Sequence, residues 1–406
     1  MTLTMRVDTT RWRGHQRRLL AAVPGLVPVV RRNGYGFGNA RLATEAGRLG
    51  ARVLAVGTTG EAVQVLSAGF PGDVLIMDPY RAGEPATQLP PGRVLRTAAD
   101  FEALRALAAA GFPRRRTVVE CGADAHRQGI GQAELHLLAD GPPLAGFALH
   151  PRTLAAGASP CLQTRTALPA SDFGYADHLE LLTGGTGHPL TPPHALPEAV
   201  GGWIRAIEAA GLRADDVFLG DLRASEAADL MRRHPETAFR CRVGTRLWLG
   251  APGALTARAA VLDTVPVGRG ERFGRHRRRA AVPGRLLVVA GGTADGIGLE
   301  AVHRSRSLAA RCRKIARAGR PTAHCVLSPY SWRGRPLQYA EPPYRHTGLL
   351  FVPEDTVPPE VGDELVLTAR HATTSFDRVV HCEPAPAPAA DPGGAVRSAH
   401  GGPSVR

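Results

Sequence analysis

Polar residues that are able to bind an anion stand at the ends of short, apolar, β-branched runs of the sequence. Guanidinium groups pair with phosphate and carboxylate, and an imidazole both donates and accepts hydrogen bonds. Taken singly, each is more often a solvated charge or a satisfied hydrogen-bond partner, so only their joint placement favours a function. The candidates are Arg31 to Tyr35, Glu120 to Arg127, His150, and Arg242 to Thr245.

Eight apolar runs alternate with amphipathic helical patterns in the first 245 residues. This alternation is typical of parallel βαβ units, and eight units are what a (β/α)8 barrel of the TIM type requires. In such a barrel the working residues lie at the carboxyl ends of the strands. A doubly wound open sheet is the alternative, because the count depends on weak runs such as 93–96. The expected strands are 25–30, 53–57, 73–78, 93–96, 117–121, 145–150, 216–220 and 239–243, and the expected helices are 40–49, 60–68, 98–110, 196–210 and 224–233.

The pattern changes after Gly250, where apolar runs follow one another without long helices, apart from a basic helical stretch near 303–318. We therefore expect a (β/α)8 barrel over 1–250 and a C-terminal, mostly antiparallel β domain over 251–382. Residues 151–195 replace the expected sixth helix with a long loop or a distorted helix. The Pro- and Ala-rich segment 383–406 is expected to be a disordered tail. The C-terminal runs are 258–265, 285–290, 323–327, 348–352 and 363–369.

The composition is that of a globular protein with a formal charge of +14. Nearly all the basic residues are arginine, since Lys314 is the single lysine, and this bias is typical of GC-rich coding. The charge is therefore weak evidence for nucleic acid, which we do not expect as a partner. The six cysteines form no C-x-x-C pair, and no long apolar segment occurs. These features predict a soluble cytoplasmic protein with reduced thiols, no metal site and no membrane contact.

The stretch Val29-Val30-Arg31-Arg32-Asn33-Gly34-Tyr35-Gly36-Phe37-Gly38 resembles a known cofactor motif. Alanine racemases and their relatives of pyridoxal-phosphate (PLP) fold type III carry Val-Val-Lys-Ala-Asn-Ala-Tyr-Gly-His-Gly, whose lysine holds PLP as a Schiff base. The lysine position is Arg31 here. The resemblance extends through most of residues 20–370 and is weakest over 151–195. It implies a barrel followed by a β domain, a homodimer, PLP as cofactor and an amino acid as substrate.

Further motifs of that family assign roles to other residues of this sequence. Tyr35 takes the place of a phosphate-contacting tyrosine, and Thr293 replaces a second one. Arg127 matches an arginine that bonds the phenolic oxygen of the cofactor, and Glu120 stands where the family often has a modified lysine. The remaining matches are His150 beside the cofactor ring, Arg242 at the pyridine nitrogen, Gly244 and Thr245 as a backbone cradle for phosphate, and Arg345 and His346 at a Met-Asp pair.

Two departures from the family pattern fall on residues that carry out the reaction. Racemisation needs two bases on opposite faces of the substrate carbon, which in the family are the PLP lysine and a tyrosine of the other subunit. Arg31 replaces the lysine, and Phe273 in Gly270-Glu-Arg-Phe-Gly274 replaces the tyrosine. We therefore expect an alanine-racemase-like protein that is impaired or inactive and retains binding of PLP, an anion or an amino acid. The alternatives are an active alanine racemase that interconverts L- and D-alanine with PLP, and a basic nucleic-acid-associated protein.

Overall fold

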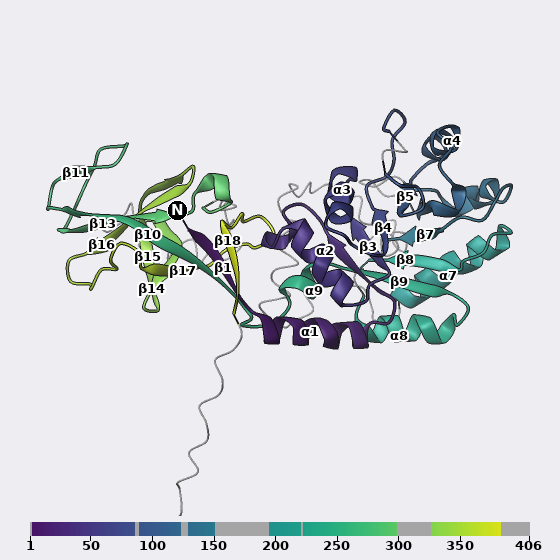
Figure 1. Cartoon of the computed structure of the whole chain (residues 1–406), viewed down its shortest axis with the longest axis horizontal. Coiled ribbons are helices and arrows are strands. Elements are labelled where there is room, and N and C mark those ends of the chain that lie inside the picture. Colours follow the sequence, from purple (N-terminus) through teal and green to yellow (C-terminus); the bar gives the residue numbers. More distant parts are fainter. Residues whose placement is uncertain are drawn as a thin grey trace, which may run out of the picture.

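The strands between residues 26 and 243 form a closed parallel barrel in the computed structural model, which describes residues 2–85, 89–122, 129–150, 195–220, 222–298 and 326–382 (Figure 1). The barrel closes where β2 pairs with β9, with Leu26 opposite Cys241. Closure confirms the (β/α)8 prediction and excludes the open sheet. The strands are β2 (Leu26–Val30), β3 (Val53–Val56), β4 (Asp73–Ile76), β5 (Val94–Ala98), β6 (Thr117–Cys121), β7 (Gly146–Leu149), β8 (Asp216–Leu219) and β9 (Ala238–Val243).

Amphipathic helices pack around the barrel at the predicted places. α4 begins later than predicted because the side chain of Asp100 accepts a hydrogen bond from the backbone N–H of Ala103 and caps the helix. α3 begins with a reciprocal cap between Thr58 and Glu61. The elements are α2 (Asn39–Arg48), α3 (Thr59–Ser67), α4 (Phe101–Ala109), α7 (Ala195–Ala209), α8 (Ala224–Arg233) and α9 (Thr245–Leu249), with the 3-10 turns η1 (Gly34–Gly36), η2 (Arg114–Arg116) and η3 (Gln132–Leu138).

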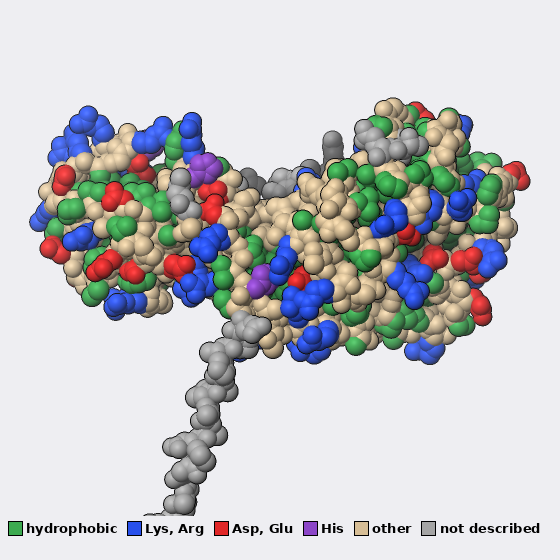
Figure 2. All heavy atoms as spheres, viewed as in Figure 1, with side chains coloured by type: hydrophobic (Ala, Val, Ile, Leu, Met, Phe, Trp, Pro, Cys, Tyr) green, Lys and Arg blue, Asp and Glu red, His purple; other side chains and the backbone are tan. Residues whose placement is uncertain are grey.

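A second, mostly antiparallel sheet follows the barrel, as predicted. Its longest strand, β10, pairs with β17 over 257–260 and with β13 over 261–267, so that the sheet returns on itself around its own apolar core. Basic side chains gather at the end that carries the β11–β12 hairpin (Figures 1 and 2). The strands are β10 (Leu255–Val267), β11 (Arg272–Phe273), β12 (Arg278–Arg279), β13 (Gly284–Ala290), β14 (Val326–Trp332), β15 (Arg335–Tyr344), β16 (Thr347–Pro353), β17 (Glu364–Leu367) and β18 (Arg378–Cys382).

The N-terminus joins the two parts of the molecule, which the sequence patterns did not indicate. β1 (Leu3–Asp8) pairs antiparallel with β10 and parallel with β18 in the second sheet. It leads directly into α1 (Thr9–Ala22), which packs along the barrel. The proposed boundary at residue 250 lies between α9 and β10, and the chain crosses between the two parts a second time near residue 8.

Two buried tryptophans fix α1 to the barrel. The indole N–H of Trp12 donates to the carbonyl of Trp248 in α9 at 2.7 Å, and the indole N–H of Trp248 donates to the carbonyl of Val29 in β2 at 2.7 Å. Trp12 also stacks on Phe37 with ring centroids 4.8 Å apart. A buried indole needs an acceptor for its N–H, so this relay sets the position of the segment that follows β2.

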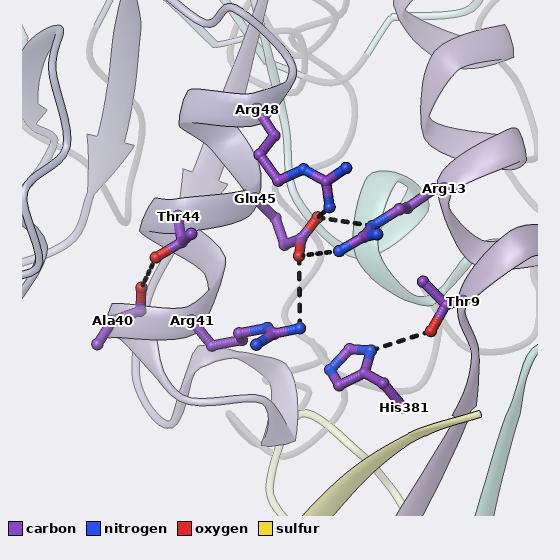
Figure 3. Close-up of polar contacts among 8 residues, drawn as sticks. All are labelled: Thr9, Arg13, Ala40, Arg41, Thr44, Glu45, Arg48 and His381. Carbon is purple, nitrogen blue, oxygen red and sulfur yellow. Dashed lines mark hydrogen bonds and ion pairs between the residues drawn. The ribbon is translucent and has the colours of Figure 1, made fainter. Parts of the chain in front are cut away.

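A buried carboxylate makes a further connection between α1 and α2 (Figure 3). Glu45 is 2% exposed and accepts two hydrogen bonds from Arg13, at 2.7 and 3.1 Å. Arg41 and Arg48 approach the same carboxylate at 3.6 and 3.7 Å. Burial, assisted by Arg41, lowers the pKa of the neighbouring His381 on β18, whose ring lies 3.3 Å from the hydroxyl of Thr9.

Several of the sequence predictions fall outside the described residues. They concern Arg127, most of the interruption at 151–195, the basic stretch near 303–318 with Lys314, most of the run 323–327, and the tail 383–406. Within the described ranges, no helix combines the length and apolar character that a membrane span requires.

Candidate functional site

Side chains fill the barrel interior, so the surface available for a ligand is the rim at the carboxyl ends of the strands. At the opposite end Arg116 pairs with Asp73 at 2.8 Å, and Arg240 pairs with Asp216 at 2.6 Å. Between the two ends lies an apolar layer that points to the barrel axis. Its members are Val27, Val29, Ala55, Leu75, Leu95, Val118, Ala148 and Phe218.

Three of the predicted polar residues face the barrel axis near this rim. Side chains alternate along a strand, so Glu120 and His150, each two residues past a member of the apolar layer, point the same way. Arg242 lies opposite Val27 in the register of β9 and β2 and therefore shares its direction. Glu120 is 2% exposed, Arg242 is 8% exposed and His150 is half-buried. A carboxylate, an imidazole and a guanidinium therefore lie at the same end of the barrel, largely shielded from water.

Backbone carbonyls of the neighbouring strands hold the guanidinium of Arg242. Its Nε donates to the carbonyl of Leu219 at 3.2 Å, and its Nη2 donates to the carbonyl of Leu149 at 3.5 Å. These carbonyls belong to the last residues of β8 and β7. The cation is consequently fixed at the strand ends, where it can attract a negative group.

The segment after β2 is a tight turn with two left-handed residues and a hydrogen bond to the second domain. Arg32 and Tyr35 adopt left-handed φ values of 58° and 54°, which are uncommon for residues with a side chain. The amide of Asn33 donates to the carbonyl of Thr374 at 2.8 Å, and so links the turn to the second domain. Arg31 is exposed at the start of this turn, and its guanidinium forms no ion pair with the described residues. Among the described residues, no carboxylate therefore competes with an anion for this charge.

The turn places Tyr35 against the start of α9. Tyr35 is 4% exposed, and a Cβ built on Gly244 would lie 2.1 Å from its hydroxyl oxygen. Only glycine therefore allows this approach of the phenol to the backbone at Gly244 and Thr245. Residues from two distant segments, each predicted to bind phosphate, are brought together.

Two other predicted residues lie in the second domain. Phe273 packs against Val267, Ala280 and Leu286 beneath the β11–β12 hairpin, at the end of the molecule away from the barrel. Thr293 is exposed in the turn η5 (Thr293–Asp295). Within one chain, the structure does not bring Phe273 to the rim that carries Arg31.

Cys121 does not serve as a nucleophile beside Glu120. Burial, with a smaller effect of the Glu120 carboxylate, raises the pKa of this thiol far above its ordinary value. The thiolate is the reactive form of cysteine, so the side chain stays inert.

The comparisons with known proteins agree with this geometry. The alanine racemase N-terminal domain matches residues 8–144. Alanine racemase of Nitratidesulfovibrio vulgaris is 30% identical over 118 residues, which are 29% of this chain and 31% of that protein, so the matched region spans about a third of its length. The solved alanine racemase of Streptomyces lavendulae superimposes with a TM-score of 0.62 at 20% identity, covering 94% of this chain and 97% of that chain. Alanine racemase of Bartonella henselae, solved with covalently bound pyridoxal phosphate, gives 0.62 at 13% identity, covering 94% and 100%.

Residues 8–144 thus resemble the N-terminal domain of alanine racemases, and the chain as a whole shares the fold of the solved alanine racemases. The family roles given to Tyr35, Gly244 and Arg242 stay predictions, although the structure places these residues at the rim. Arg127, the predicted partner of the phenolic oxygen, lies outside the described residues. The segments that match two family motifs of the second domain lie side by side, since Ala294 N–H donates to the carbonyl of Arg345 at 2.9 Å.

Arg96 is a buried cation that the sequence analysis did not single out. It is 1% exposed on β5, where it donates to the hydroxyl of Thr59 at 3.0 Å and to the carbonyl of Pro85 at 3.2 Å. Burial lowers its pKa, against the raising effect of Glu84. The sequence signal for this residue was an arginine directly after two apolar residues, Val94 and Leu95, of a predicted strand. Arg96 thereby links the segment after β4 to α3.

The contact between Tyr35 and Gly244 gives a direct prediction. Gly244→Ala should lower the free energy of unfolding by about 1–3 kcal/mol, because the added methyl group overlaps the phenol. Tyr35→Phe removes the overlapping oxygen and should recover part of this loss in the Gly244→Ala background. Urea unfolding of the two single variants and the double variant measures the coupling. Additive losses would show that the two residues do not touch.

Proposed function

We propose that this chain is an alanine-racemase-like protein that binds a small amino acid or anion at the barrel rim, with PLP as its expected cofactor, and lacks lysine-dependent racemisation. The observation that carries the proposal is Arg31 directly after β2, exposed at the start of the turn that contains the buried Tyr35. The single lysine of the sequence, Lys314, follows η5 along the chain, more than 70 residues after the last barrel strand.

Arginine does not replace lysine as the covalent anchor. A Schiff base requires a neutral amine, whereas a guanidinium keeps its proton to a pKa above about 12. Burial lowers the pKa of some lysines by several units, but Arg31 is exposed. Its charge instead suits it to bind a carboxylate or a phosphate through paired N–H donors.

The other residues at the rim fit PLP held without a covalent bond. Tyr35 and the backbone at Gly244 and Thr245 would hold its phosphate, and Arg242 with His150 would adjoin its ring. The close approach of the Tyr35 hydroxyl to Gly244 supports this assignment. When bound, PLP supplies an electron sink beside the carbon that carries the amino group. Arg31 would neutralise a carboxylate or phosphate at the entrance.

The second base is also missing in the proposed assignment. Phe273 has no proton to exchange, and it lies in the second domain, away from Arg31 of its own chain. The proposal therefore includes a homodimer, in which the second domain of one copy approaches the barrel of the other. Sedimentation of the purified chain tests the dimer.

An active alanine racemase is the second candidate, because the contact between Tyr35 and Gly244 and the buried Arg242 fit a cofactor pocket that is in use. Such an enzyme would have to exchange the substrate proton with groups other than a lysine at position 31 and a tyrosine at position 273.

Reaction with PLP and with alanine separates the two candidates. We expect the purified chain to bind PLP reversibly, with weaker binding in Tyr35→Phe, and to yield no borohydride-reduced adduct in the barrel by peptide mass. A Lys314→Arg control identifies any adduct on the sole lysine. Exchange of the alanine α-proton in deuterated water, above the rate with PLP alone, would overturn the proposal in favour of the active enzyme.

A further inference from the structure

Three arginines of α1 and α2 surround one buried carboxylate where β18 meets these two helices (Figure 3). Arg13 donates two hydrogen bonds to Glu45, at 2.7 and 3.1 Å. Arg41 and Arg48 approach the same carboxylate at 3.6 and 3.7 Å. One carboxylate neutralises only one guanidinium, so these four side chains together carry two positive charges in excess.

His381 brings an imidazole from β18 to the same cluster. Its Nδ1 lies 3.3 Å from the hydroxyl oxygen of Thr9, and its ring centroid lies 6.0 Å from that of Trp12. The other ring nitrogen, Nε2, is buried and has no hydrogen-bond partner among the described residues. Few buried polar atoms lack a partner in folded proteins, so this nitrogen indicates a group that the chain itself does not supply.

The imidazole lies in the positive field of the cluster. Burial lowers the pKa of His381, and the charge of Arg41 lowers it further. Glu45 opposes this effect, while Arg13 adds to it. With the Thr9 hydroxyl donating to Nδ1, the neutral ring carries its proton on Nε2. The cluster then presents one more N–H donor beside the guanidinium groups, and no acceptor for that donor.

The donors of Arg41 remain available to a ligand. Its separation of 3.6 Å from Glu45 is longer than a hydrogen bond, and its side chain is 42% exposed. Arg13 differs, since its Nε and Nη2 already bond the carboxylate. A guanidinium pairs with two oxygens of a tetrahedral oxyanion, and the excess of two positive charges matches a dianion such as sulfate or hydrogen phosphate.

We propose that Arg41 and His381 bind a small tetrahedral oxyanion, sulfate or phosphate, across the junction between α2 and β18. Arg41 supplies paired N–H donors, Nε2 of His381 supplies a further donor, and Arg13 contributes its charge. Because α2 covers the barrel and β18 belongs to the second sheet, the anion connects the two parts of the molecule. The site contains no residue assigned to PLP or substrate at the rim, so it does not depend on the function proposed there.

Proton NMR of the His381 ring tests the site, with sulfate as the probe because it stays doubly charged over the range in which histidine titrates. The signal is identified by its loss in His381→Asn. At constant ionic strength, sulfate should raise the titration midpoint of His381 in a saturable manner, since a bound dianion offsets the charges of Arg41 and Arg13. Phosphate at a fixed pH should compete with sulfate for this effect. A shift that chloride reproduces would mean screening without binding and would overturn the proposal.

Two arginines of α2 provide the matched variants, with the same NMR signal as the readout. Arg41→Gln should weaken sulfate binding at least about tenfold, because it removes charge-assisted hydrogen bonds to the anion. Arg48→Gln is the control, since Arg48 lies 3.7 Å from the same carboxylate but is not among the groups that shift the pKa of His381. Its effect on sulfate affinity should stay below about threefold, as is usual for an exposed charge. Both side chains are exposed, so both variants should fold. Unchanged binding in Arg41→Gln, or equal losses in the two variants, would overturn the proposal.

Discussion

Arg31→Lys combined with Phe273→Tyr should give an alanine α-proton exchange activity well above that of the unmodified chain. Lysine restores an amine that is able to anchor PLP and act as a base, and tyrosine restores a proton donor for the opposite face. General acid–base catalysis contributes about 10²–10⁴-fold, so we expect exchange at least about 100-fold above that of the unmodified chain with PLP. Proton NMR of L- and D-alanine in deuterated water measures it.

Single replacements and a neighbouring arginine serve as controls for this experiment. Either change alone should recover little, because racemisation needs a base on each face. Arg32→Lys adds a lysine one residue away, but the Arg32 backbone is turned to bond Glu61 at 2.6 Å and has a φ of 58°. That variant should show no more exchange than the unmodified chain. A double variant that anchors PLP and still shows no exchange would mean that the pocket lacks more than two groups.

The barrel was predictable because its strands are locally encoded. A run such as 117–121 is short, mostly apolar and buried along its whole length, and helices such as α3 have their own caps and periodicity. The strand β1 was missed for the opposite reason. Its partners are β10 and β18, more than 240 residues away along the chain, and a single strand of six residues gives little signal of its own.

Some residues of the candidate site were predictable from their place in the sequence, and others were not. Glu120, His150 and Arg242 were found because strand ends of a barrel face one rim, which is a rule of position. The contact between Tyr35 and Gly244 depends on a left-handed backbone and on the tryptophan relay through Trp12 and Trp248, and no local pattern encodes these. Arg275 and Arg345 likewise lie over one ring, that of Tyr344, because two turns come together only in the folded sheet.

Glu45→Gln should be among the most destabilising single changes in the region where α1 and α2 meet. The carboxylate is almost fully buried and neutralises Arg13, while Arg41 and Arg48 add to the field around it (Figure 3). Removing one partner of a buried ion pair leaves the other charge uncompensated, which typically costs about 3–5 kcal/mol. Arg13 retains some exposure to water, so we expect a loss of about 2–4 kcal/mol in urea unfolding.

The surrounding arginines supply the internal control for Glu45. Arg48→Gln removes an exposed group 3.7 Å from the carboxylate and should cost no more than about 1 kcal/mol. His381 adds no further positive charge near neutral pH, since burial lowers its pKa, so the net charge around Glu45 rests on the arginines. If Glu45→Gln and Arg48→Gln cost the same small amount, Glu45 behaves as a surface ion pair. A large difference means that this buried carboxylate, in addition to the two tryptophans, holds α1 against α2.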